Sequence, residues 1–260
     1  MSRTESLVLY EKSDHIAVIT LNRPAALNTV NPELTAALRE AMDRFEQEDD
    51  AWVAILTGAG DRAFCAGMDL KSFAAGHGPE IISGRGGFAG FISYPRTKPV
   101  IAAINGLALG GGGEIALACD MVILSETAKL GQPEVKRGIF ACAGAAFRLP
   151  RRIPVNKAME LLLTGDFIDA RTALDLGLAN QVVPPGQLMD AARDLASRIC
   201  ANAPLAVRET LALVKASPDM SEAELWEIND AAWDRTLATE DAAEGPRAFT
   251  EKREPVWQGK

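Results

Sequence analysis

Two apolar runs, WVAILT at residues 52–57 and VIAAI at residues 100–104, constrain the fold more than any other feature of the chain. Neither run alternates apolar with polar residues, so neither offers a face suited to water. Strands of this kind are buried on both faces, as in a parallel sheet covered by helices. With two earlier strand-like stretches, LVLYEK and IAVITLN, they predict an α/β protein.

Helix signals follow the strand-like stretches. Asn31 and Pro32 suit the cap and the first turn of a helix, and apolar residues then recur at helical spacing. Late in the chain helix follows helix: Pro204 can open one, and Ser221 with Glu224 forms a capping box for the next. The chain therefore divides into an α/β part and a later helical part.

The last long helix carries a wide apolar band. Its members are Leu225, Trp226, Ile228, Ala232 and Trp233. A band of this width predicts either packing on another subunit or cover for the chain's own core, and the sequence leaves both open.

Composition excludes several classes of function. A chain of 260 residues can bury a full core, and we expect one globular domain with a helical appendage. The net charge of −8 argues against general binding to nucleic acid or to an anionic membrane. No window is apolar for long enough to span a membrane, so we expect a cytoplasmic protein without membrane or nucleic-acid partners.

The cysteines are single and lack the paired spacing of a metal site. They are Cys65, Cys119, Cys142 and Cys200. We expect four reduced core residues, no disulfide and no metal site.

Glycine-rich matches to the dinucleotide fingerprint G-x-G-x-x-A occur twice, in GAGDRA at residues 58–63 and GRGGFA at residues 84–89. Two matches in one chain indicate that glycine content alone produces them. The acid that should follow the first match falls inside a loose stretch, residues 74–90, which we expect to be a mobile loop. A nicotinamide or flavin enzyme is therefore the weaker hypothesis.

A second use of glycine is an oxyanion hole. The turn in FCAGMD follows the strand-like run at residues 52–57, and the turn in ALGGGGE follows the run at residues 100–104. Both turns would lie beyond the carboxyl ends of parallel strands, where backbone N–H groups at a helix start lack intrahelical acceptors. Two such donors aimed at one carbonyl oxygen would stabilise an oxyanion.

Two acids lie close to these turns in the sequence. Glu114 follows the glycine run in the first turn of an apolar helix, and Glu134 follows in a turn with Gly131 and Pro133. For Glu114 alone, a favourable interaction with the helix dipole is the simpler interpretation. Two carboxylates in one site can instead divide acid and base work, because each raises the pKa of the other.

At these residues the chain resembles the crotonase superfamily, and within it the enoyl-CoA hydratases. The resemblance runs through LNRPAALNTVNPEL, ILTGAGDRAFCAGMDL, KPVIAAINGLALGGGGEIALACD, AKLGQPEVKRG, MELLLTGDFIDARTALDLGLANQVVP and EGPRAFTEKREPVW. It implies a ββα spiral core over residues 1–195, with the CoA site and the active site. It also implies a helical region over residues 196–260 that closes the pocket and assembles a homotrimer, or a hexamer of two trimers.

The resemblance also implies the reaction. Met68 and Gly111 match the two backbone oxyanion donors, and Glu114 and Glu134 match the two catalytic glutamates. Water would add syn across the C2=C3 bond of a trans-2-enoyl-CoA, with Glu114 as the base and Glu134 as the acid. No metal or redox cofactor is implied, because coenzyme A enters as part of the substrate.

Further positions match residues that bind CoA in the family. They are Arg23, Ala25, Ala66, Asp69, Leu70 and Lys71, with Phe249 and Lys252 at the adenine and phosphate end, often from a neighbouring subunit.

The chain departs from the family pattern after the second glutamate, where it reads GIFACAGAAFRL. Ala141 stands where proline is common, and Cys142 and Ala145 stand where glycine is common. We expect Cys142 to line the pocket. Gly113 likewise replaces a bulkier residue before the first glutamate. Because of these departures, the sequence does not identify the acyl group of the substrate.

Two alternatives remain. One is an isomerase of the same superfamily, which generally relies on one acid. The other is a non-catalytic acyl-CoA or RNA binding protein on the same fold, with a basic cluster made of Lys136, Arg137, Arg148, Arg151 and Arg152. The absence of interleaved aromatic residues favours a solvated surface for this cluster.

Overall fold

Two sheets carry the fold in the computed structural model, which describes residues 6–260. The first five residues of the proposed core domain thus lie outside the described residues. The larger sheet has the strand order β1-β2-β3-β5-β7-β10. Its strands are β1 (Val8–Ser13), β2 (Ile16–Leu21), β3 (Val53–Gly58), β5 (Val100–Ile104), β7 (Met121–Ser125) and β10 (Gln181–Val183). Only the β1–β2 pair is antiparallel among these described strands.

The smaller sheet has the order β4-β6-β8-β9. Its strands are β4 (Ala63–Cys65), β6 (Leu107–Leu109), β8 (Lys129–Gly131) and β9 (Phe167–Asp169). The first three are parallel and β9 is antiparallel to β8. The predicted α/β class is confirmed, and β3 and β5 are buried along their whole length, as their sequences predict.

The same structural unit occurs three times, although the sequence has no visible repeat. β3, β5 and β7 of the larger sheet are each followed within a few residues by β4, β6 and β8 of the smaller one, in the same lateral order. Gly106 makes one of these turns tight, because a Cβ there would lie 2.6 Å from the carbonyl carbon of Arg62. The loops after β4, β6 and β8 therefore leave the same edge of the smaller sheet.

This arrangement corrects the sequence analysis on one point. The turn in FCAGMD follows β4, not β3, and the turn in ALGGGGE follows β6, not β5. Three-residue strands are too short to produce a periodic pattern, so the sequence did not reveal them.

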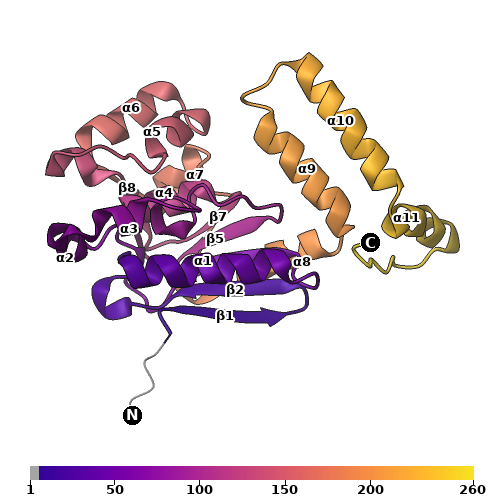
Figure 1. Cartoon of the computed structure of the whole chain (residues 1–260), viewed down its shortest axis with the longest axis horizontal. Coiled ribbons are helices and arrows are strands. Elements are labelled where there is room, and N and C mark those ends of the chain that lie inside the picture. Colours follow the sequence, from indigo (N-terminus) through magenta and orange to yellow (C-terminus); the bar gives the residue numbers. More distant parts are fainter. Residues whose placement is uncertain (1–5) are drawn as a thin grey trace, which may run out of the picture.

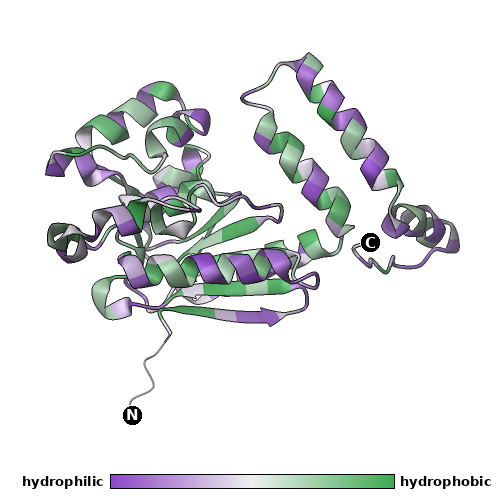
Figure 2. Ribbon diagram, in the orientation of Figure 1, coloured by the Kyte–Doolittle hydropathy of each residue, from purple (hydrophilic) through white to green (hydrophobic). Residues whose placement is uncertain are grey.

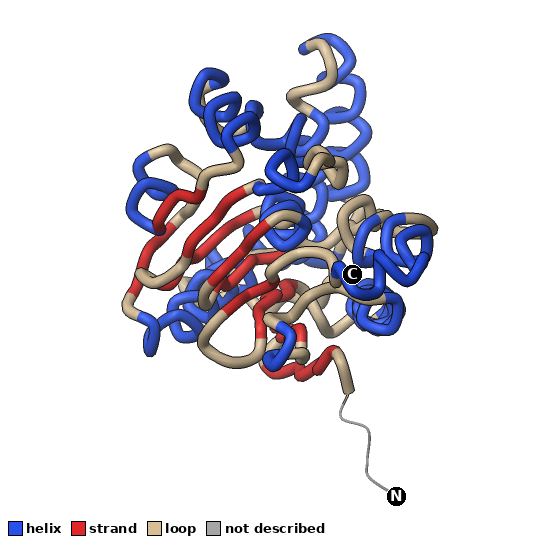
Figure 3. Tube along the Cα trace, turned by 90° about the vertical axis from the view of Figure 1, so that its left-hand side faces the viewer, coloured by secondary structure: helices blue, strands red, loops and turns tan. Residues whose placement is uncertain are grey.

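Helices α1 (Pro32–Gln47) and α8 (Leu188–Cys200) cover opposite faces of the larger sheet. Leu34, Leu38 and Phe45 of α1 join one apolar cluster, and Leu188 and Ala192 of α8 join the other. Figure 3 shows the strands enclosed by helices in this way. The predicted cap of α1 is present, since the Asn31 side chain accepts a hydrogen bond from the Leu34 N–H at 2.9 Å.

Shorter helices surround the smaller sheet. They are α2 (Leu70–Ser72), α3 (Gly78–Ile82), α4 (Gly111–Ala118), α5 (Ala145–Arg148), α6 (Val155–Thr164) and α7 (Ala170–Asp175). Single helical turns occur at η1 (Pro24–Ala26), η2 (Phe73–His77), η3 (Phe88–Gly90), η4 (Pro133–Arg137), η5 (Leu149–Arg151) and η6 (Pro185–Gln187).

The stretch 74–90 is not the open loop that its composition predicts. It contains η2, α3 and η3, and it buries Ile81 and Phe88 in the main core. Its many glycines concealed these two apolar anchors. The expectation of an irregular loop is therefore wrong for most of its length, whereas its mobility stays a prediction.

Three helices form an arm that stands away from both sheets (Figure 1). The arm consists of α9 (Pro204–Ala216), α10 (Glu222–Leu237) and α11 (Glu240–Glu251). The predicted capping box of Ser221 and Glu224 starts α10. No helix among residues 6–260 has the length and apolar character needed to cross a membrane.

The apolar band of α10 does not cover the chain's own core. Trp226 and Trp233 are 58% and 61% exposed, and only Ala232 of the band is buried. Figure 2 shows hydrophobic residues on both α9 and α10, well away from the sheets. The division at 195/196 falls inside α8, which packs on the larger sheet, so we propose that the helical region begins after Cys200.

Candidate active site

The loops after β4, β6 and β8 meet at one edge of the smaller sheet. A Cβ on Gly67 would lie 3.0 Å from the Leu109 carbonyl oxygen and 3.3 Å from the Gly111 nitrogen. A Cβ on Gly110 would lie 3.1 Å from Oε1 of Glu134. Gly67 and Gly110 both have positive φ, which glycine adopts without strain. Glycine is thus required where the three loops come into contact.

Two backbone N–H groups at this meeting point have no acceptor among residues 6–260. Val30 bonds to the first loop on either side of Met68, through Val30 N to Gly67 O and Asp69 N to Val30 O, both at 2.8 Å. Among the described residues nothing accepts a hydrogen bond from the Met68 N–H. Gly111 is the first residue of α4, so its N–H has no intrahelical acceptor. The structure therefore brings the two predicted oxyanion donors onto touching loops.

Glu114 lies in the first turn of α4 and is only 3% exposed. The Ala145 N–H donates a hydrogen bond to its Oε1 at 3.1 Å. The pKa of Glu114 is raised to about 7, mainly by burial and in addition by the charge of the nearby Glu134, while the Ala145 N–H acts in the opposite direction and favours the ionised form. Near neutral pH this carboxyl group can both hold and release a proton.

Glu134 lies in η4, on the loop after β8. Burial raises the pKa of this carboxyl group as well. Its Oε2 atom is buried and has no hydrogen-bond partner among the described residues. An unpaired buried carboxylate oxygen is costly, and protonation reduces that cost. Both carboxyl groups therefore bind a proton more tightly than a free glutamate does.

Replacing Glu114 by Gln is expected to stabilise the protein at high pH. A folded-state pKa of about 7, above the ordinary value of 4.5, means that the folded protein binds this proton more tightly than the unfolded chain does. The burial penalty is absent below about pH 4.5, grows between pH 4.5 and pH 7, and is constant at higher pH, where both states are ionised. The gain in unfolding free energy should reach about 3 kcal/mol above pH 8.

Urea unfolding of wild type and Glu114→Gln at pH 5 and pH 8 measures this difference. The exposed Glu33→Gln on α1 is the matched control, and it should leave the pH dependence of stability unchanged. A Glu114→Gln gain that is equal at the two pH values would contradict the assigned pKa.

Two predicted CoA contacts interact with each other. Arg23 Nη2 donates to Asp69 Oδ2 at 3.1 Å, and Arg23 Nη1 donates to the Thr29 carbonyl. Asp69 also caps α2 by accepting from the N–H groups of Lys71 and Ser72. Arg23 therefore holds the Met68 loop in place and is not a free surface cation.

The other predicted contacts differ in exposure. Ala25, Leu70 and Lys71 are exposed, and Ala66 is half-buried next to Gly67. Phe249 and Lys252 belong to the arm, and Phe249 is 87% exposed. α11 and α2 lie at opposite ends of the molecule in Figure 1. The structure does not bring Phe249 or Lys252 to the active site of their own chain.

Cys142 is exposed, which corrects the expectation that all four cysteines are core residues. Cys65 and Cys119 are buried, Cys200 is half-buried, and all four are free. Burial raises the pKa of the Cys142 thiol, and the charges of Glu114 and then Glu134 raise it further. Its thiol is thus close enough to interact with both carboxylates.

Sequence reasoning missed several residues around the pair. The Ala145 N–H that holds Glu114 follows Gly144, a residue with positive φ at the start of α5, and this glycine is the only local signal. Gln132 is buried, and its Nε2 would lie 2.5 Å from a Cβ on Gly113. The small residue before Glu114 therefore makes room for Gln132.

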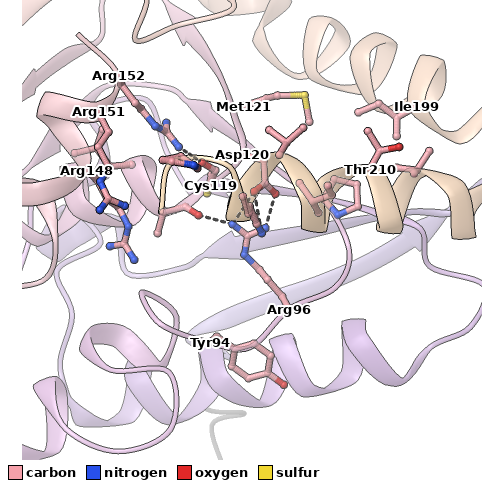
Figure 4. Close-up of a pocket in the computed structure, with 18 of the residues that line it drawn as sticks. Tyr94, Arg96, Cys119, Asp120, Met121, Arg148, Arg151, Arg152, Ile199 and Thr210 are labelled. Carbon is pink, nitrogen blue, oxygen red and sulfur yellow. Dashed lines mark hydrogen bonds and ion pairs between the residues drawn. The ribbon is translucent and has the colours of Figure 1, made fainter. Parts of the chain in front are cut away.

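A cavity of about 1050 Å³ lies between the core and α9, and none of the predicted site residues lines it. Figure 4 shows Asp120 at its centre, paired with Arg96. Lys215 of α9 also reaches Asp120 at 3.1 Å, so this ion cluster ties the arm to the core.

The basic cluster proposed for RNA is not one free surface. Arg148 and Arg152 donate to the carbonyls of Ile92 and Cys119, and Arg151 pairs with Asp219. Lys136 pairs with Asp166. Four of its five cations are thus engaged within the chain, which removes the main support for RNA binding.

The chain is similar to known proteins over nearly its whole length. The family model described as enoyl-CoA hydratase/isomerase matches residues 11–260. A carnitinyl-CoA dehydratase from Proteus mirabilis is 43% identical, over 99% of this chain and 100% of the relative. The crystal structure of an enoyl-CoA hydratase from Mycobacterium marinum matches with a TM-score of 0.94 and 45% identity, covering 98% of this chain and 100% of that one. A carnitinyl-CoA hydratase from Mycobacterium avium matches with a TM-score of 0.77 and 41% identity, covering 99% and 100%.

Proposed function

Because the chain belongs to the enoyl-CoA hydratase/isomerase family, whose crotonase fold it shares, we propose that it adds water across the C2=C3 bond of a trans-2-enoyl-CoA. The product is a 3-hydroxyacyl-CoA, and the same site catalyses the reverse dehydration. One observation carries the proposal: two carboxyl groups with raised pKa values, the buried Glu114 and the half-buried Glu134, lie beside two N–H groups that make no hydrogen bond among the described residues.

The proposed reaction uses each group once. The thioester carbonyl oxygen accepts hydrogen bonds from the N–H groups of Met68 and Gly111, which stabilise the enolate-like charge as it develops. Glu114 takes a proton from water while the water oxygen bonds to C3. Glu134 then supplies the proton that bonds to C2, and the two carboxyl groups exchange roles in dehydration. The Ala145 N–H supports the ionised form of Glu114, and the unpaired Oε2 of Glu134 supports the protonated form of that residue.

An isomerase of the same family is the alternative within this chemistry. Incubation in D₂O distinguishes the two reactions. A hydratase converts a trans-2-enoyl-CoA into a 3-hydroxyacyl-CoA with one deuterium at C2, on the same face as the new oxygen. Conversion of a trans-3-enoyl-CoA into the trans-2 isomer, with no oxygen added to either substrate, would overturn the proposal in favour of the isomerase.

The acyl group has two candidates. The first is a simple enoyl chain, supported by the enoyl-CoA hydratases among the solved structures. The second is a carnitinyl thioester, supported by the carnitinyl-CoA dehydratase at 43% identity over nearly the whole chain. A carnitinyl thioester is itself a 3-hydroxyacyl-CoA, so both candidates use the same proton transfers. Comparing kcat/KM for crotonyl-CoA and for the dehydration of carnitinyl-CoA decides between them.

We further propose that the arm assembles a homotrimer, or a hexamer of two trimers, in which a partner's arm completes each CoA site. The exposed tryptophans of α10 and the distance of α11 from its own active site support this. Burial of these apolar side chains between subunits would remove them from water. Sedimentation equilibrium should give a mass at least three times that of the chain, and a monomer at micromolar concentration would contradict the assembly.

Lys252→Gln is expected to raise KM for the CoA ester about 10-fold, the loss typical of one charge-assisted phosphate contact, with little change in kcat. The reason is that Lys252 would contact the phosphate end of CoA, far from the reacting carbons. Steady-state kinetics measures both constants. Lys157→Gln, at an exposed lysine on α6, is the control. An unchanged KM for Lys252→Gln would contradict its role in binding CoA.

A further inference from the structure

The ring of Phe88 lies directly against Gly111. A Cβ on Gly111 would lie 2.5 Å from Cε1 of that ring, closer than real Cβ atoms approach, and 3.2 Å from Cε2, which is also a tight contact. Phe88 is only 6% exposed and belongs to the main core cluster. Glycine at position 111 is thus required by the aromatic edge that faces it, because Gly111 itself is not among the residues with positive φ.

The segment that carries Phe88 is held tightly. A Cβ on Gly86 would lie 3.0 Å from the Gly90 Cα, and a Cβ on Gly90 would lie 2.8 Å from the Thr35 carbonyl oxygen of α1. Ser93 N donates to Gly86 O at 2.9 Å. Ala89 has a φ of 59°, an uncommon conformation for a residue with a side chain. The backbone on both sides of Phe88 is therefore folded onto itself and onto α1.

These contacts explain the GRGGFA stretch, which neither the dinucleotide fingerprint nor the proposed proton transfers account for. Its glycines allow close backbone approaches within residues 84–90 and between that segment and α1. The segment therefore forms a rigid support that holds one edge of the Phe88 ring against Gly111, at the start of α4. An edge in van der Waals contact limits how far the neighbouring backbone can shift.

We infer that Phe88 is a positioning residue for the Gly111 oxyanion donor, an inference that rests on the proposed function. An oxyanion donor works only when its N–H lies about 2.7–3.1 Å from the position of the developing charge. Gly111 lacks a side chain that could hold its peptide in place, and Phe88 supplies that constraint from outside. The phenyl side chain of Phe88 has no acidic or basic group and takes part in no proton transfer.

A double-mutant cycle between positions 88 and 111 tests the inference. Gly111→Ala forces a methyl group against the ring and should lower kcat by about 10²-fold, the loss typical of one misplaced donor. Phe88→Leu removes the three ring atoms that the methyl group would strike, and alone it should lower kcat about 10-fold with KM nearly unchanged. The double variant should regain at least 10-fold of the kcat that Gly111→Ala loses.

Phe45→Leu is the matched control, because Phe45 is a buried phenylalanine of the same core cluster on α1. It should not restore the activity of Gly111→Ala. If Phe88→Leu fails to restore it as well, or if Phe45→Leu restores it equally, the inference is overturned. Circular dichroism checks that each variant is folded.

A binding measurement keeps this test separate from the proposed reaction. Dimethylaminocinnamoyl-CoA is a coloured conjugated thioester whose absorption moves to longer wavelength when its carbonyl is polarised. The shift should be largest in wild type, nearly lost in Gly111→Ala and partly regained in the double variant, even if the enzyme hydrates no enoyl-CoA. A shift that is equal in wild type and Phe88→Leu would overturn the positioning role.

Discussion

Glu134→Gln is expected to lower kcat for hydration by about 10³–10⁴-fold, at the upper end of what one positioned acid contributes. The amide cannot supply the proton that bonds to C2. Glu134 is half-buried, and its Oε2 atom is buried without a hydrogen-bond partner among the described residues, so water does not readily replace this acid. Binding of the CoA ester should persist, because the oxyanion donors and the CoA contacts are unchanged.

The Glu114→Gln, Glu134→Gln double variant refines this expectation. Two residues that act as one unit are strongly non-additive, so the double variant should be only slightly slower than either single variant. Glu126→Gln is the control, because Glu126 is an exposed acid just after β7. A double loss equal to the product of the single losses would contradict a shared proton relay. A protein that keeps its function without both glutamates would instead be a binding module.

Met68→Pro is expected to lower kcat by about 10²–10³-fold, because it removes one oxyanion donor. The substitution breaks no backbone hydrogen bond among the described residues, since the Met68 N–H donates none and the bonds to Val30 skip it. Met68→Ala is the matched control, because it changes the side chain and keeps the N–H. It should retain most of the activity.

Steady-state kinetics on the two Met68 variants measures their kcat values, and thermal unfolding checks that both are folded. The difference between them measures the donor alone. Equal losses in Met68→Pro and Met68→Ala would mean that the side chain matters and that the backbone donor at position 68 does not.

The strands that could be predicted from the sequence are those with long patterns. β3 and β5 are continuous apolar runs, and the start of α1 has an Asn cap and a proline, so local chemistry was sufficient. β4, β6 and β8 have three residues each and no periodic signal. Their positions depend on pairing between segments more than 20 residues apart, which no local pattern records.

The residues of the site also divide into those that the sequence identifies and those that only the fold reveals. The sequence was sufficient to identify Glu114, Glu134 and the glycine turns, because carboxylates and glycines are the residue types that this chemistry requires. The Ala145 N–H could not, because any residue has an N–H and only the fold aims this one at Glu114. The Arg23–Asp69 ion pair was missed for the same reason, since it joins residues 46 positions apart. Phe88 was assigned to a loose loop because neighbouring glycines outweighed its apolar side chain.

The central claim is that Glu114 and Glu134 together hydrate an enoyl thioester held by the N–H groups of Met68 and Gly111. The most direct measurement is the loss of the conjugated thioester absorbance when pure protein is mixed with crotonyl-CoA. The account predicts rapid loss with wild type and almost none with Glu134→Gln. Equal rates for the two proteins, or no loss with wild-type protein that binds crotonyl-CoA and carnitinyl-CoA yet converts neither, would contradict it.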